Sequence, residues 1–188
     1  MAHYSHPTTD GLETVRKFVN TVHHEQGEVE EDLGSPAALR EFLADAGLGR
    51  VEVKPADLRR ALEVREALRD VMGANNGEAL RPESVELLNR TAARAKVVAA
   101  FDDHASWRIE PVSNGVDHVL GQLLATVFRS MSDGTWERMK ACGNPDCRWA
   151  FYDGSKNRSG RWCEMASCGN RMKARAFRER ARKTQPQQ

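Results

Sequence analysis

The sequence is marked first by what it lacks. None of its 188 residues before position 142 is a cysteine, only 6% are aromatic, and no apolar run approaches the roughly 18 residues that a membrane span requires. The first residues carry neither a basic flank nor an apolar segment, which argues against a secretory signal peptide. These absences predict a globular, cytoplasmic chain with room for one ordinary domain and a small appendage.

Recognisable catalytic motifs are missing as well. The chain has no glycine-rich phosphate loop, no Gly-x-Ser-x-Gly and no His-Glu-x-x-His. The adjacent His23 and His24 would point about 100° apart on a helix, which is a poor arrangement for sharing one metal ion. We therefore expect a binding protein and not an enzyme.

The net charge is close to zero, but the two parts of the chain differ in sign. Residues 138–188 contain 13 Lys and Arg against four Asp and Glu, a net charge of +9, whereas residues 1–137 contain 15 against 23, a net charge of −8. A genome rich in arginine codons would not concentrate the surplus at one end. The asymmetry therefore indicates an anionic partner for the C-terminal part.

Hydrophobic periodicity predicts a mainly helical domain over residues 1–137. Apolar residues recur at three- and four-residue steps over 10–26, 36–46, 55–72, 82–94 and 116–131, which predicts five helices. Two β-favouring runs, 96–101 and 107–112, flank a polar stretch and predict one hairpin. The acidic stretch 28–32 is expected to be a loop. This domain would sense a signal or form a homodimer.

Two polar residues, Asn20 and Thr21, interrupt the apolar stripe of the first predicted helix. A buried amide and hydroxyl are costly unless they find hydrogen-bonding partners. They could bind a small molecule or a partner, or they could bond the backbone of a neighbouring loop. Both readings stay open at this point.

The four cysteines form a compact C-x4-C-x15-C-x4-C pattern: Cys142, Cys147, Cys163 and Cys168. Two close pairs supply the four soft ligands that tetrahedral Zn²⁺ prefers. Two disulfides would be the alternative, but a reducing cytoplasm and the absence of other cysteines favour one zinc ion per chain.

The residues between the cysteines predict a knuckle and then a hairpin, in which a β-favouring segment at 148–152 is followed by a turn-rich stretch and a returning strand at 161–163. A helix then begins near Cys168. The predicted fold is thus a mainly α domain with a small β-hairpin (α+β), followed over 138–188 by a treble-clef-like four-cysteine zinc finger that ends in a basic helix. So small a module would depend on its metal for stability.

The closing helix, predicted over 169–183, has two distinct faces. One face carries Arg171, Arg175, Arg178 and Arg182. Ala174, Phe177 and Ala181 share another face and are expected to rest on the zinc core. Such a charged helix could simply be a solvated surface, but next to a zinc module it favours a phosphate-binding surface. The candidate nucleic-acid-binding residues are Lys156, Arg158, Arg161, Arg171, Lys173, Arg175, Arg178 and Arg182.

The sequence also resembles a known family. The segment 161–171 (RWCEMASCGNR), followed by Lys173 and Arg175, resembles the CGNR zinc finger, named after the run that here is 168–171. Cys142 and Cys147, with Phe151, Asp153, Ser155 and Asn157, fit the same pattern. Phe18-Val19-Asn20-Thr21 is similar to the signature of the helical ABATE domain that precedes this finger in the family, as are Pro36, Leu39 and 62–68.

This resemblance implies a bacterial transcription regulator, described as stress-induced, whose four-cysteine finger ligates zinc and binds DNA. An interaction module, in which the finger docks on an acidic protein, is the alternative from another class. An RNA-binding role is a third reading. The sequence names neither the operator nor the signal.

Overall fold

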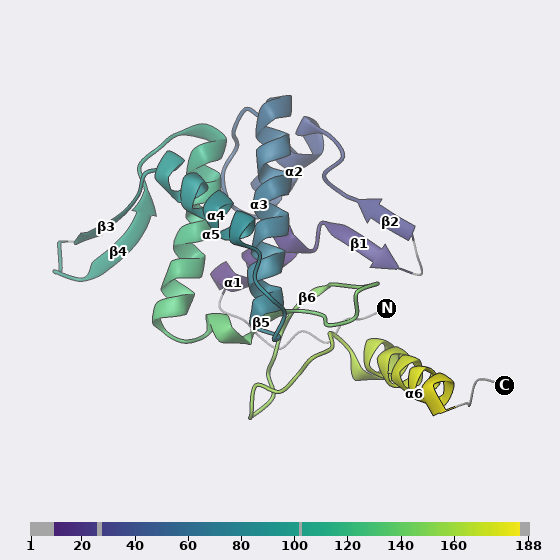
Figure 1. The fold of residues 1–188 in the computed structure, drawn as a ribbon. Coiled ribbons are helices and arrows are strands. Elements are labelled where there is room, and N and C mark those ends of the chain that lie inside the picture. The colour runs from purple at the N-terminus through teal and green to yellow at the C-terminus, as the bar shows by residue number, and fades with distance from the viewer. Residues whose placement is uncertain (1–9, 26–27, 102, 185–188) are drawn as a thin grey trace.

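The computed structural model describes residues 10–25, 28–101 and 103–184. Its larger part is a helical bundle in which α3 (Pro55–Ala74) and α5 (Gly115–Ser132) are the long helices (Figure 1). The shorter helices α1 (Asp10–Val19), α2 (Pro36–Asp45) and α4 (Pro82–Arg94) pack around them. None of the helices in these described ranges is long and apolar enough to cross a bilayer.

Proline and cap residues set the starts of three helices. Pro36, Pro55 and Pro82 each occupy the first turn, where the missing amide hydrogen is not needed. The Ser35 hydroxyl accepts a hydrogen bond from the amide of Ala38 and caps α2. The four helices predicted over 36–46, 55–72, 82–94 and 116–131 are confirmed to within two residues at each end.

The first predicted helix is wrong in its second half. Helix α1 ends at Val19, and the chain then forms a hairpin of β1 (Val22–Glu25) and β2 (Glu28–Glu31), where we expected helix and loop. The helix ends because the Thr21 hydroxyl donates to the Phe18 carbonyl (2.8 Å) while the Asn20 side chain bonds a distant strand. The His23–His24 pair thus lies on a strand.

The second hairpin matches its prediction. Strands β3 (Val97–Phe101) and β4 (Trp107–Pro111) pair antiparallel, from Val97 opposite Pro111 to Phe101 opposite Trp107. The ribbon projects from the bundle, at the left in Figure 1. Phe101 and Trp107 at its outer end are 78% and 55% exposed.

The cysteine-bearing part begins inside the core of the bundle. After the short turn η1 (Trp136–Arg138), strand β5 (Met139–Ala141) pairs with β6 (Ala150–Tyr152) against the lower end of α3. Met139, Ala141 and Ala150 are fully buried in the same apolar cluster as the helices. The two parts of the chain consequently share one core.

The expected return strand at 161–163 is not a strand. The partner of β6 lies before the first cysteine, and residues 161–163 instead lead into η2 (Met165–Gly169), a turn of π-helix. The Arg161 carbonyl accepts from the amide of Gly143 (2.9 Å) and from the Asn76 side chain (2.9 Å). These bonds hold the segment beside the cysteine knuckle, where Cys163 is required.

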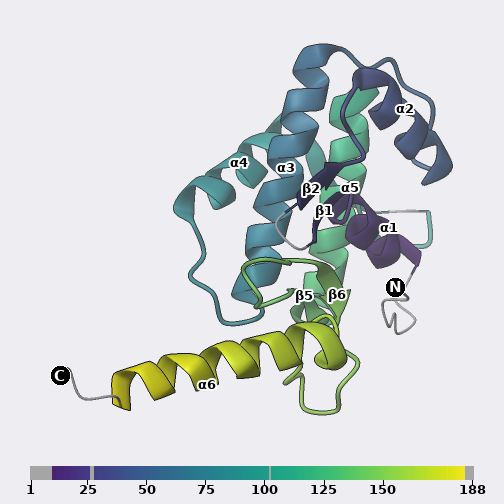
Figure 2. The ribbon, with the colours of Figure 1, turned by 90° about the vertical axis from the view of Figure 1, so that its right-hand side faces the viewer.

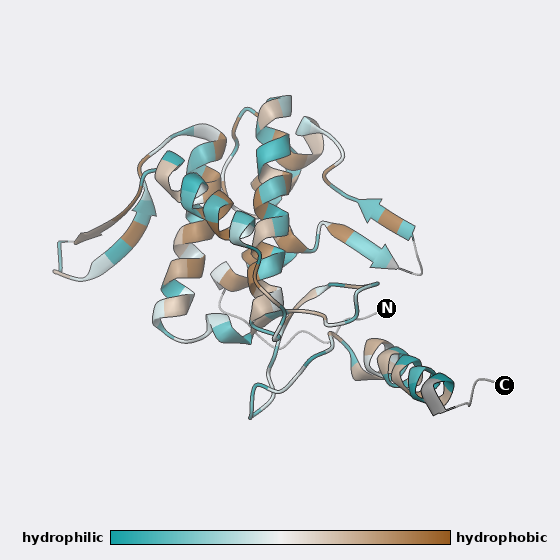
Figure 3. Ribbon diagram, viewed as in Figure 1, coloured by the Kyte–Doolittle hydropathy of each residue, from teal (hydrophilic) through white to brown (hydrophobic). Residues whose placement is uncertain are grey.

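Helix α6 (Asn170–Thr184) follows η2 and extends away from the body of the molecule (Figure 2). Over residues 170–182 every side chain is exposed except those of Met172 and Ala176, which are half-buried. Much of the helix is hydrophilic (Figure 3). The prediction that Ala174, Phe177 and Ala181 rest on the zinc core is wrong, because Phe177 is 67% exposed.

Candidate metal centre and the basic surface around it

The four cysteines converge although they come from three separate segments. Cys142 directly follows β5, and Cys147 closes the knuckle. Cys163 precedes η2, and Cys168 lies within it. Their four Sγ atoms all lie within 4.8 Å of one another, and the Cys163 sulfur is 3.7 Å from those of Cys147 and Cys168. Trp149 and Trp162 pack against this cluster.

These distances fit a single tetrahedral zinc ion. Four sulfurs each about 2.3 Å from a central zinc are roughly 3.8 Å apart along the edges of the tetrahedron. A disulfide would need sulfurs about 2.05 Å apart, and all four cysteines are free. The four cysteines are thus positioned to bind one metal ion, as the spacing predicted, and four thiolate ligands leave no open position for a reacting water.

The proximity of the sulfurs also shifts the pKa values of three of the thiols. Hydrogen bonds from Cys147 and Cys163 lower the pKa of Cys142 to about 2. The Cys142 thiolate accepts the hydrogen bond of Cys147 and thereby raises the pKa of Cys147 to about 12. The pKa of Cys163 is raised further by both neighbours. Negative charge on one sulfur keeps protons on the others, and a divalent cation displaces those protons.

The residues next to Cys168 pack closely around the four-cysteine cluster. A Cβ atom on Gly169 would lie 2.4 Å from the Met165 sulfur and 3.1 Å from the Trp162 ring. The Asn144 amide donates to the Cys168 sulfur (3.5 Å), and the Asn170 amide donates to the Ala166 carbonyl (3.0 Å). A side chain at Gly169 would therefore have to displace the half-exposed Met165 side chain and would press against Trp162.

A buried ion pair fixes the loop that joins the two halves of the finger. The Lys140 ammonium donates to Asp153 Oδ2 (2.7 Å) and to the carbonyls of Arg158 (2.6 Å) and Gly160 (3.0 Å). Burial by itself would raise the pKa of Asp153, but Lys140 together with Ser155 and Gly160 lowers it to about 2. Sequence reasoning noted Asp153 as part of a pattern and gave Lys140 no role.

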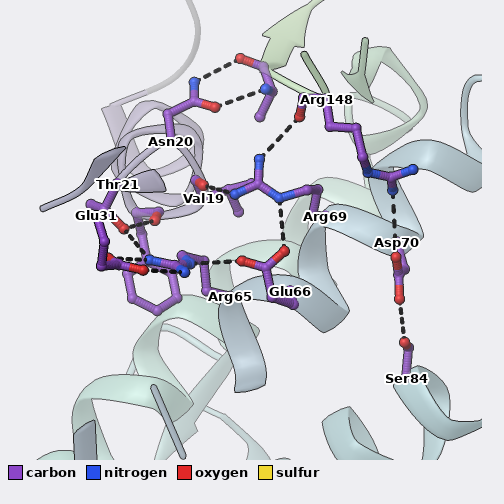
Figure 4. Close-up of polar contacts among 12 residues, drawn as sticks. Val19, Asn20, Thr21, Glu31, Arg65, Glu66, Arg69, Asp70, Ser84 and Arg148 are labelled. Carbon is purple, nitrogen blue, oxygen red and sulfur yellow. Dashed lines mark hydrogen bonds and ion pairs between the residues drawn. The ribbon is translucent and has the colours of Figure 1, made fainter. Parts of the chain in front are cut away.

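Asn20 connects the helical part to the finger (Figure 4). Its Nδ2 donates to the Ala150 carbonyl (2.8 Å), and the Ala150 amide donates to its Oδ1 (2.7 Å), so the side chain pairs with β6 as a neighbouring strand would. Thr21 bonds the Phe18 carbonyl and accepts from Arg65 (3.2 Å). Of the two readings left open, backbone bonding within the chain accounts for both side chains.

Two arginines of α3 complete this junction, and sequence reasoning missed them. Arg69 is 2% exposed and donates to the carbonyls of Val19 (2.5 Å) and Arg148 (3.0 Å), so that it ties α1 to the finger (Figure 4). Arg65 makes a two-pronged bond to Glu31 of β2, with both distances 2.7 Å. Their spacing of four residues on the apolar side of a predicted helix was a usable signal.

Further contacts from the end of α3 hold the finger's backbone. Asn75 donates to the carbonyls of Trp136 and Met139, both at 2.9 Å, and Asn76 donates to that of Ala141 (2.8 Å). The helical part thereby supplies hydrogen bonds that the short β5–β6 ladder cannot provide for itself.

The predicted nucleic-acid-binding residues fall into two groups. Arg171, Arg175 and Arg178 of α6 line a cleft of about 700 Å³, whose other walls include Glu28 of the β1–β2 hairpin and Asp146 of the knuckle. Arg182 continues the same helix face. Lys173 projects from another side of α6.

The remaining predicted residues lie in the loop before η2. Lys156 and Arg158 are exposed, and Arg158 forms an ion pair with Glu137. The Arg161 guanidinium lies 5.7 Å from the centre of the Trp162 ring, in a cation–π contact. This loop and α6 both leave the body on its lower side in Figures 1 and 2.

The helical part also has a hollow of its own, of about 450 Å³, between α1, α5 and the base of β4. His118 and Gln122 line it, and the His118 Nδ1 lies 3.0 Å from the Ser113 carbonyl. Within the described part of the chain, the buried Gln122 Oε1 has no hydrogen-bonding partner.

Two family models match successive parts of the chain. The CGNR zinc finger matches residues 138–181, and the ABATE model, described as "Putative stress-induced transcription regulator", matches residues 13–133. A search of curated proteins gives no match. Because the ABATE match covers more than half of the chain and is followed directly by the finger, the chain belongs to the ABATE family of proteins with a C-terminal CGNR zinc finger.

Proposed function

We propose that this protein is a zinc-dependent, DNA-binding transcription regulator of the cytoplasm. In this proposal the finger and α6 contact DNA, and the helical part senses a signal or forms a homodimer. It acts by binding, not by catalysis, since its metal centre has no open coordination position. The family description supports this class of function.

The observation that carries the proposal is the character of α6. This helix contains seven basic residues and one acidic residue, and its described side chains are almost all exposed. A helix of about 15 residues is marginal by itself in water. Here the zinc centre and η2 anchor its first turn, which leaves a preformed cationic rod for a polyanion.

The experiment compares Arg175→Ala/Arg178→Ala with the unaltered chain in a salt titration of duplex DNA binding. If both arginines contact phosphates, the slope of log affinity against log salt flattens by about 1.8, since each phosphate contact contributes about 0.9. A guanine contact would instead cost about 1–3 kcal/mol at one base position.

The matched control is Arg40→Ala/Arg50→Ala, which removes the same charge at exposed positions of the helical part. It should leave the slope unchanged. A zinc-loaded Arg175→Ala/Arg178→Ala protein with unaltered DNA affinity across the titration would contradict DNA binding by this face of α6.

For the signal, the hollow lined by His118 and Gln122 supports a small polar ligand, because a buried amide oxygen without a partner can accept a hydrogen bond. Binding of a candidate effector should raise the melting temperature of the unaltered chain and not that of Gln122→Leu.

An interaction module remains the second candidate. Phe101 and Trp107 form an exposed aromatic pair at the end of the β3–β4 ribbon, which suits a protein partner. DNA binding that survives Phe101→Ser/Trp107→Ser, together with loss of a co-purifying protein, would assign the ribbon to protein contacts and α6 to DNA.

A further inference from the structure

Helix α6 exposes an apolar stripe on the side of the helix opposite its two half-buried residues. Successive residues of an α-helix are about 100° apart, so Ala174, Phe177 and Ala181 lie about 150° around the axis from Met172 and Ala176. Met172 and Ala176 are the two half-buried residues that mark the inner side of the helix. Phe177 and Ala181 therefore lie on the outer side of α6, whereas Ala174, near the start of the helix, also lines the cleft that faces the β1–β2 hairpin.

Basic residues flank this stripe on both sides. Arg171 and Arg178 lie about 70–90° from its centre in one direction, and Lys173 and Arg180 lie about as far in the other. All four are exposed, and Arg171 and Arg178 also border the cleft opposite Glu28 and Asp146. The helix thus presents an apolar ridge between two rows of positive charge.

This pattern matches the cross-section of the DNA major groove. The groove is about 12 Å wide and accepts a helix of roughly 10–12 Å diameter, with a phosphate wall on each side and base edges on its floor. A helix seated there meets the two walls with its flanks and the floor with its central ridge. Duplex RNA has a major groove too narrow for the same fit.

We propose that α6 lies in the major groove with Phe177 on the floor, against the C5-methyl groups of thymine. Among the groups that the bases present in this groove, the thymine methyl is apolar and the rest are hydrogen-bond donors and acceptors. A phenyl ring can bond none of those polar groups, whereas it can bury a methyl. The small side chains of Ala174 and Ala181 on either side permit close approach of the backbone.

This inference deepens the proposed DNA-binding function and rests on it. It assigns the second phosphate wall to Lys173 and Arg180, which lie off the face that the sequence singled out. The charge pattern argues against a second copy of α6 as the occupant, because the two cationic rods would repel each other at close range.

The test uses duplexes that the full chain selects from a random pool, resynthesised with deoxyuridine in place of thymidine on both strands. This substitution removes the methyl groups and keeps the hydrogen-bonding pattern. The unaltered chain should bind the uracil duplexes about fourfold more weakly for each methyl contacted, since burial of one such carbon contributes that much. The Phe177→Ala chain should bind both kinds of duplex equally.

Two further measurements complete the test. Lys173→Ala/Arg180→Ala should keep the thymine preference and flatten the salt slope by about 1.8. Zinc content and helical circular dichroism of Phe177→Ala should equal those of the unaltered chain, because its ring lies in solvent.

The outcomes separate the two proposals. Equal binding of thymine and uracil duplexes by the unaltered chain, or selection that enriches no sequence, overturns the placement of Phe177 and leaves DNA binding intact. Loss of a dimer in sedimentation of Phe177→Ala overturns it in favour of a second copy. No binding of any duplex by the unaltered chain removes the proposed function itself.

Discussion

Replacing Asn20 should reveal how strongly the finger depends on the helical part. Asn20 is 5% exposed and Ala150 is fully buried, and the two exchange hydrogen bonds of 2.8 and 2.7 Å across 130 residues of sequence. In Asn20→Ala both bonds vanish, and the amide and carbonyl of Ala150 remain buried without partners. Each such group costs about 1–3 kcal/mol, so the two together should lower the free energy of unfolding by about 2–6 kcal/mol.

In a chain of this size a loss of about 1 kcal/mol lowers the melting temperature by about 2–4 °C, which predicts a fall of about 4–24 °C. Thermal unfolding followed by circular dichroism, with urea unfolding at 25 °C, measures it. Zinc content should stay at one per chain, because no ligand is altered. Asn20→Asp should be at least as harmful, since a carboxylate cannot donate to the Ala150 carbonyl.

Asn89→Ala is the matched control, because Asn89 is exposed on α4 and its loss should cost less than about 0.5 kcal/mol. If the melting temperature of Asn20→Ala equals that of the unaltered chain, the pairing of Asn20 with β6 contributes nothing to stability and the prediction is wrong. If it also loses a regulated output while its stability is unchanged, a ligand site at Asn20 and Thr21 becomes the better reading.

Three further predictions concern the finger and its surroundings. Cys168→Ser should bind well under one zinc per chain, and residues 154–184 should become sensitive to limited proteolysis while β5 and β6 stay protected in the shared core. One zinc per chain in this variant would contradict the four-cysteine centre. Asp153→Ala should cost about 3–5 kcal/mol at pH 7, because it leaves Lys140 buried and unpaired. The pKa of Asp153 is lowered to about 2, so the stability that Asp153 contributes is complete above its unfolded pKa of about 3.9 and is lost as the pH falls towards 2. The urea midpoint of Asp153→Ala should therefore lack this pH dependence, whereas the midpoint of the exposed control Asp45→Ala should keep it. Glu28 lines the same cleft as the arginines of α6, so Glu28→Gln should raise the affinity for DNA about twofold at low salt and leave it unchanged at high salt. The control Glu41→Gln should not change the affinity. Equal effects of the two substitutions would contradict the idea that Glu28 weakens the attraction between these arginines and DNA.

The local features of this protein could be predicted from its sequence. Four helices, the β3–β4 hairpin and the four-cysteine centre depend on periodicity, on prolines such as Pro55, or on the spacing of like ligands, and each of these signals lies within a short stretch of chain. The first helix failed at Asn20 because its apolar period continues through Val22, while a partner 130 residues away ends the helix.

Only the tertiary structure decided which polar groups became structural and which face of α6 stayed open. Arg69 looks like a surface residue by type, yet it is buried because two carbonyls from distant segments need a donor at that point. Phe177 looks like a core residue by type, yet it is exposed because η2 directs α6 away from the zinc centre. The sequence by itself determined the ligands and the charge of the finger; the direction in which that charge points depends on long-range packing that no local pattern encodes.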